Sequence, residues 1–117
     1  ERLVESSDRS AFLHKHVPRV STLIAIDNEA SDGFTIVEVF TEDRIGVLFT
    51  ITHGLRRLGL SIHVAKISTN VDQVADVFYV TDEHGKKIEQ PDRVEAIRES
   101  LYRRLAPQDA RIAQSGH

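Results

Sequence analysis

The sequence predicts an α+β fold in which two helices cover one face of an antiparallel sheet, in the order ββαββα. Three observations support it: segments with the alternating or β-branched pattern of strands, two segments with helical apolar spacing, and short turn clusters between them. Because neither amphipathic helix can bury its apolar stripe alone, both should pack on one face of the sheet and form a two-layer sandwich.

The N-terminal part of the predicted domain is a pair of strands. Residues 1–17 mix charged residues and Ser without a sustained period, so we expect a linker there. β-branched residues then alternate with others over 18–26, which is typical of a strand. The turn cluster 28–33 separates this strand from 34–40, whose β-branched and aromatic composition makes it the clearest strand of the chain.

A helix and a hairpin follow the polar connection 41–46. One apolar stripe of this helix is formed by Val47, Leu48, Ile51, Leu55 and Leu58. Gly59 should end the helix in the left-handed conformation that favours glycine. Strands are predicted at 61–69 and 74–81, with a turn at 70–73, so that the two form a hairpin.

A second helix completes the domain. Pro91 suits the first turn of a helix, where its missing N–H group costs nothing. The predicted buried stripe of this helix consists of Val94, Ile97, Leu101 and Leu105. Pro107 should stop the helix, and 106–117 is expected to be a polar tail. The predicted domain therefore spans residues 18–105.

The predicted order of elements indicates a ferredoxin-like sandwich that lacks its usual last strand. Residues 34–105 follow a β-α-β-β-α-β unit up to its second helix, and no strand pattern comes after Leu105. The short turn 28–33 should pair the strand 18–26 antiparallel beside 34–40. That edge is the one the missing strand would occupy, so we interpret the N-terminal strand as its replacement.

Composition excludes several classes of function. With 117 residues, 40% of them hydrophobic, the chain has the size of one globular domain. It has no apolar run long enough to span a membrane and no Cys, and its net charge of −3 does not favour nucleic acid or anionic lipid. We expect a cytoplasmic location. Because the chain starts with Glu and contains no Met, we also expect it to be a piece of a longer protein.

Several stretches resemble the ACT domains, a family of small-molecule-sensing modules. E-D-R-I-G-V-L at 42–48 is similar to the D-R-P-G-L-L loop of that family. With I-D-N-E-A-S-D at 26–32 and D-V-F-Y-V-T-D at 76–82, the likeness extends to the C-terminal ACT domain of bifunctional uridylyltransferase/uridylyl-removing enzymes, which modify the nitrogen-regulatory PII protein. The resemblance implies an allosteric amino-acid-binding module, with glutamine the favoured ligand, that does no chemistry itself.

The start of the first helix is the expected ligand site. Free N–H groups and a partial positive charge there suit a carboxylate, and Gly46 has no Cβ to keep a ligand from the backbone. The resemblance adds the strand after Gly59, because ligands of ACT dimers often lie between this loop and that strand of the neighbouring subunit. The candidate ligand-binding residues are Asp43, Arg44, Ile45, Gly46, Val47, Leu48, Ile62 and His63. Under either interpretation, Asp43 is expected to cap the helix.

One departure from the family motif keeps a second function open. Ile45 stands where ACT domains usually have Pro, which presets the backbone of a first helical turn. The alternative is a structural dimerisation or interdomain-packing module without a working ligand site.

Enzymatic, metal-binding and RNA-binding functions are disfavoured. We expect no cofactor, catalytic residue or metal site, because the six His lack zinc-site spacing and the chain has no Cys nucleophile or glycine-rich phosphate loop. Arg44 beside Asp43 allows an acylphosphatase-like site, but a solvated loop pair is the favoured interpretation. Phe78 and Tyr79 are adjacent and point to opposite faces of their strand, which disfavours base stacking.

The sheet is expected to have a partner. On both 34–40 and 74–81, alternate residues are largely apolar on each face, and the helices can cover only one of them. A large uncovered apolar face marks an interface. We therefore expect a homodimer or contact with another ACT domain, and neither a nucleic-acid nor a membrane partner.

Overall fold

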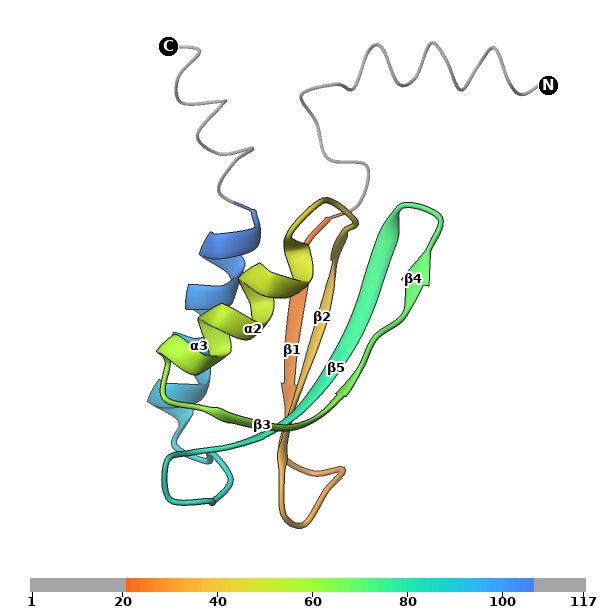
Figure 1. Cartoon of the computed structure of the whole chain (residues 1–117). Coiled ribbons are helices and arrows are strands. Elements are labelled where there is room, and N and C mark those ends of the chain that lie inside the picture. Colours follow the sequence, from red (N-terminus) through yellow and green to blue (C-terminus); the bar gives the residue numbers. More distant parts are fainter. Residues whose placement is uncertain (1–20, 107–117) are drawn as a thin grey trace, which may run out of the picture.

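The computed structural model describes residues 21–106, and the predicted linker and almost all of the predicted tail lie outside them. Its elements are, in order, β1 (Leu23–Asp27), β2 (Thr35–Glu42), α2 (Val47–Arg57), β3 (Ser61–Lys66), β4 (Thr69–Asn70), β5 (Gln73–Thr81) and α3 (Pro91–Leu105). The sheet is antiparallel with the order β1-β2-β5-β3, and β4 also pairs with β5. Both helices cover the same side of it (Figure 1). The predicted α+β sandwich is confirmed.

The N-terminal strand lies where the ferredoxin-like order leaves an edge open. β1 pairs antiparallel with β2 from Leu23 opposite Phe40 to Asp27 opposite Ile36. Within the described residues it covers 23–27 rather than the predicted 18–26, since residues 21 and 22 are not part of the strand. Ile24 is only 4% exposed and belongs to the hydrophobic core, so β1 is packed as well as hydrogen-bonded.

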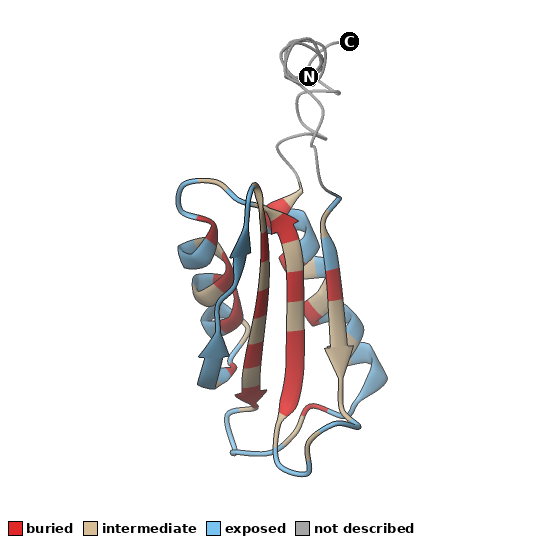
Figure 2. Cartoon of the chain, turned by 90° about the vertical axis from the view of Figure 1, so that its right-hand side faces the viewer, coloured by how far each residue is buried: buried red, intermediate tan, exposed pale blue. Residues whose placement is uncertain are grey.

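The predicted strand 61–69 is interrupted. β3 ends at Lys66, its pairing with β5 is irregular around His63, and the chain pairs with β5 again only at β4. Asn70 and Gln73 are paired with each other, so the predicted turn 70–73 is reduced to residues 71 and 72. Most side chains of β3 and β4 are exposed, as Figure 2 shows, and little apolar burial is therefore available to hold this edge in one continuous register.

The core lies between the sheet and the helices. Figure 2 shows buried and intermediate residues alternating along most of β5 and along β2 from Val37 onward, as expected for strands with one face packed on the helices. At the start of β2, Ile36 is also buried although it lies on the other face. The helix-facing positions of β2 and β5 are Thr35, Val37, Val39, Thr41, Val74, Asp76, Phe78 and Val80. They meet the buried stripes of α2 (Val47, Ile51, Leu55) and α3 (Ile97, Leu101, Leu105).

Two predicted helix ends are confirmed. Gly59 follows the last residues of α2 with φ of 82°, in the left-handed region that favours glycine. Pro91 opens α3 in its first turn, as predicted.

Candidate functional site

The N-terminus of α2 has no side-chain cap. Gly46 occupies the N-cap position with φ of 81° and ψ of 3°, so the prediction that Asp43 caps this helix is wrong. The left-handed turn at Gly46 delays the start of the helix to Val47, which leaves Asp43 three residues before the N-cap. The N–H of Val47 donates to the carbonyl of Arg44 (3.1 Å), and that of Thr50 to the carbonyl of Gly46 (2.9 Å).

Two amides of the first turn remain available. Among the described residues, the N–H groups of Leu48 and Phe49 have no backbone acceptor, as the geometry of a helix N-terminus requires. Both residues are exposed, and a Cβ built on Gly46 would meet no atom within 4 Å. An anion can therefore approach these amides from solvent, where the partial positive charge of the helix end favours it.

The other loop residues hold the loop in place. The N–H of Asp43 donates to the carbonyl of Asp72 (2.9 Å) and ties the loop to the turn between β4 and β5. The guanidinium of Arg44 donates through Nη2 to the carbonyl of Leu105, the last residue of α3. Arg44 is thus directed to the end of α3, and the expected solvated pair with Asp43 is replaced by this contact. Ile45 is fully exposed.

The structure separates the two groups of predicted ligand residues. Glu42 pairs with Gln73 at one end of β5 and Ile62 pairs with Val80 near the other. Seven residues of strand amount to roughly 23 Å. Ile62 packs against the core, while His63 shares a hydrogen bond of 2.8 Å between its Nε2 and the Thr81 hydroxyl. A small ligand cannot contact both groups within one chain.

Asp76 is a buried carboxylate that the sequence analysis did not single out. It is 1% exposed, and among the described residues its Oδ2 has no hydrogen-bond partner. Its Oδ1 accepts a hydrogen bond from the N–H of Ser68 (3.3 Å). Burial raises the pKa of Asp76 above its ordinary value, the Ser68 hydrogen bond opposes this, and the nearby charge of Asp43 raises the pKa further. The feature of the sequence that could have pointed to Asp76 is its position as a charged residue among the apolar, helix-facing residues of β5.

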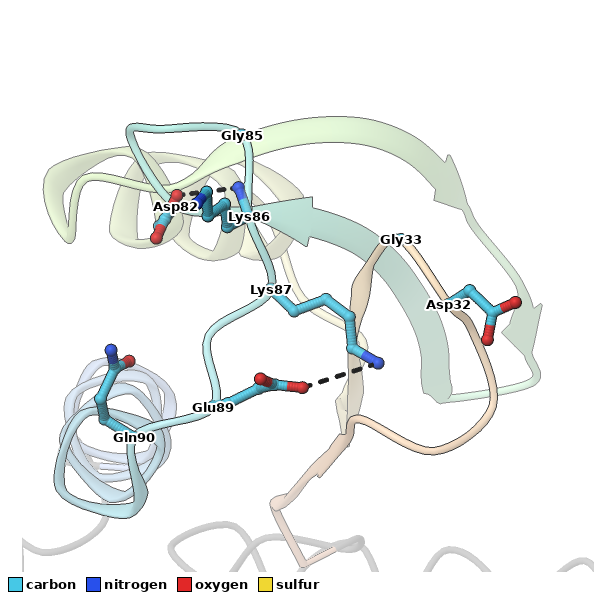
Figure 3. Close-up of a pocket in the computed structure, with 8 residues that line it drawn as sticks. All are labelled: Asp32, Gly33, Asp82, Gly85, Lys86, Lys87, Glu89 and Gln90. Carbon is cyan, nitrogen blue, oxygen red and sulfur yellow. Dashed lines mark hydrogen bonds and ion pairs between the residues drawn. The ribbon is translucent and has the colours of Figure 1, made fainter.

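A polar depression of about 480 Å³ lies between the loop 28–34 and the loop 82–90 (Figure 3). Lys87 is a half-buried charged group of this depression, and its Nζ already donates to the carbonyls of Asn28 (2.7 Å) and Ser31 (2.8 Å). The N–H groups of Lys86 and His84 donate to Asp82 and help to hold its pKa below the ordinary value. These groups are occupied in joining and shaping the two loops, so the depression is a structural feature rather than a ready ligand site.

No metal centre or membrane segment is found in the part of the chain that the structure describes. Residues 21–106 contain no group of three or more His, Asp or Glu side chains placed to hold a metal ion. None of the described helices combines the length and apolar character needed to cross a membrane.

Comparison with known proteins gives matches over most of the chain. A sequence model of the ACR family N-terminal ACT domain matches residues 30–106. The chain is 42% identical over 95 residues to a bifunctional uridylyltransferase/uridylyl-removing enzyme of Azospirillum brasilense, covering 81% of the chain and 10% of that protein. An enzyme of the same name from Rhodopseudomonas palustris is 40% identical over 105 residues, covering 90% of the chain and 11% of that protein. The chain thus spans about a tenth of these relatives. No solved structure matches it.

Proposed function

Because this chain belongs to the ACT-domain family, in the class of the ACR family N-terminal ACT domain, we propose that it is a regulatory module that binds a free amino acid. The observation that carries the proposal is the start of α2, where Gly46 replaces a side-chain cap and two first-turn amides lack a backbone acceptor among the described residues. The α-carboxylate of an amino acid is an anion of the size that such a helix end binds. Glutamine is the favoured ligand.

The proposed parent is a cytoplasmic uridylyltransferase/uridylyl-removing enzyme that acts on the PII protein in nitrogen metabolism. Its named relatives carry those two activities, and this chain corresponds to a small part of them. The ligand would shift the parent between its transferase and uridylyl-removing states by binding one arrangement more tightly than the other, which is the thermodynamic requirement for allosteric control.

Isothermal titration calorimetry of the 117-residue chain with a panel of amino acids tests the proposal. Saturable heat with one or a few amino acids, glutamine first among them, is the expected result. If the chain binds none of these amino acids, either as a monomer or as a confirmed dimer, the result would favour the alternative of a structural module without a working ligand site.

A role in association is the second proposed function, and it is compatible with the first. The sheet face away from the helices carries Phe34, Ile36, Glu38, Phe40, Ala75, Val77 and Tyr79. The ring of Phe34 contacts two other rings here: its centre lies 5.1 Å from that of His63 and 6.0 Å from that of Tyr79. Neither described helix covers this face (Figure 2). We propose that a second copy, or another ACT domain of the parent, packs against it.

A further inference from the structure

The buried carboxylate of Asp76, on the helix-facing side of β5, suggests how the ligand is recognised. We propose that Asp76 binds the ammonium group of the amino-acid ligand while the N-terminus of α2 binds its carboxylate. This inference rests on the proposed amino-acid-binding function and assigns a residue outside the loop 42–48 to the site.

The side chain of Asp76 faces the helix layer. Asp76 alternates along β5 with Val74 and Phe78, which are both part of the core, and it lies opposite Val39 of β2. A carboxylate at this position requires polar contacts, since two oxygens offer about four acceptor sites. The Ser68 N–H fills one of these sites, on Oδ1, and among the described residues Oδ2 accepts no hydrogen bond.

Asp76 also lies at the end of the sheet where α2 begins. β2 ends at Glu42, whose partner Gln73 is only three residues before Asp76 on β5. α2 starts at Val47, after the short loop, and Val47 is buried in the core at this end of the helix. The electrostatic effect of Asp43 on Asp76 agrees with their proximity. The first turn of α2 and Asp76 therefore lie toward the same end of the sheet and on the same side of it.

The two features have complementary chemistry. A free α-amino acid carries a carboxylate and an ammonium group on adjacent atoms, so it needs a donor-rich and an acceptor-rich partner close together. The uncapped amides of α2 supply donors, and Asp76 supplies a carboxylate in a poorly hydrated position, where an ion pair is stronger than in water. An acid that lacks the ammonium group would leave the buried carboxylate unpaired and lose affinity.

Asp76 is only 1% exposed, so a ligand reaches it only if a neighbouring segment moves, and we assign this movement to the loop 43–46. Gly46 is exposed and in the left-handed region, and the described contacts that fasten the loop are the Asp43–Asp72 and Arg44–Leu105 hydrogen bonds. Ligand binding would thus change the contact between this loop and the end of α3, which gives the site a physical connection to the rest of the domain.

The test compares L-glutamine with glutaramate, which is glutamine without its ammonium group. Calorimetry on the whole chain should show the wild type binding glutamine at least about 30-fold more tightly than glutaramate, because a buried charge pair is lost with the analogue. Asp76→Asn should reduce this ratio to less than about 3-fold, because it weakens the binding of glutamine. The control Asp32→Asn makes the same chemical change in an exposed loop at the opposite end of the sheet and should keep the wild-type ratio.

Each outcome separates this inference from the function on which it rests. A folded Asp76→Asn chain that keeps the wild-type ratio would show that Asp76 is structural, and amino-acid binding would stand without it. Failure of the wild type to bind any amino acid would remove both proposals. If Asp76→Asn does not fold, the wild type provides the answer by NMR: glutamine should move the ¹³C resonance of the Asp76 carboxyl and glutaramate should not. An unmoved resonance at saturating glutamine would overturn the inference.

Discussion

The side-chain amide of Asn28 donates a hydrogen bond of 2.7 Å to the carbonyl of Ile88, 60 residues further along the chain. The Oδ1 of Asn28 accepts from the hydroxyl of Thr35 (2.6 Å), and that hydroxyl in turn accepts from the N–H of Ile88 (2.8 Å). One side chain therefore joins the loop after β1 to the segment that leads into α3.

Asn28→Ala should lower the free energy of unfolding by about 1–3 kcal/mol, since it leaves part-buried polar groups unpaired. Urea denaturation followed by circular dichroism measures the change. Asn70→Ala is the matched control, because Asn70 is exposed in β4 and should lose little. Equal losses in the two variants would show that the network does not stabilise the domain.

Ile24→Ala should cost about 2–4 kcal/mol of unfolding free energy, because a core side chain is truncated without collapse of the surrounding structure. Leu23→Ala, one residue earlier on β1 and 57% exposed, should cost less than about 0.5 kcal/mol. The comparison is made by thermal and urea denaturation. Similar small losses at both positions would mean that β1 is not integral to the core.

A chain that begins at Asp32 should be far less stable than the full chain, or insoluble. It would lose all of β1 and leave the hydrogen-bonding edge of β2 open to other molecules. Thermal denaturation and sedimentation of the two chains test this, and an unchanged melting temperature would contradict it.

Gly46→Asp should reduce amino-acid affinity at least about 10-fold, because it places a negative charge where the ligand carboxylate is expected. Gly85→Asp is the matched control: both glycines have φ near 80°, at 81° and 79°, and neither has an atom within 4 Å of an added Cβ. Both variants should therefore lose similar stability, about 1 kcal/mol from the left-handed backbone. If calorimetry finds the affinities of the two variants equal, the loop is not the ligand site.

Asp76→Asn should gain stability relative to the wild type as the pH is raised. The pKa of Asp76 is raised in the folded protein, mainly by burial, so the folded state holds the proton more tightly than the unfolded state. The wild type accordingly loses stability as the pH rises from the ordinary value of 3.8 through the raised pKa, and the loss is complete above it. Urea denaturation at a series of pH values measures the difference between the two proteins.

Asp82→Asn provides a control of opposite sign for this pH series. Its pKa is lowered, above all by the hydrogen bond from the Lys86 N–H, so the wild type gains stability from Asp82 as the pH rises through that lowered pKa. Relative to the wild type, Asp82→Asn should then lose stability with rising pH. The same trend in both variants would show that the Asp76 effect does not come from burial.

Val77→Asp should weaken self-association, because it introduces a charge in the middle of the open sheet face. Sedimentation velocity over a concentration series should show a dimer for the wild type and a monomer for this variant. Val71→Asp makes the same substitution at an exposed turn residue with φ of 35°, a conformation that Asp tolerates better than Val, and should leave the dimer intact. A wild type that stays monomeric at high concentration would exclude the open face as an interface.

Local patterns in the sequence determined most of the fold. The alternation in 34–40 and 74–81 predicted strands, and the structure extends β2 only to Glu42 and begins β5 at Gln73. Gly59 and Pro91 marked helix ends because their backbone requirements are local properties of single residues. The loop 42–48 was recognisable for the same reason, as a motif of consecutive residues between a strand and a helix.

Only the tertiary structure decided which face of each strand is buried, since the pattern was apolar on both sides and the choice depends on where α2 and α3 pack. It also decided that Arg44 reaches Leu105, that His63 lies far from Gly46 within one chain, and that Asp76 is left with an unpartnered oxygen. These relationships join residues that are distant in sequence. They arise when strands and helices pack together. The periodic pattern of one segment predicts that segment's own secondary structure but not its contacts with distant segments.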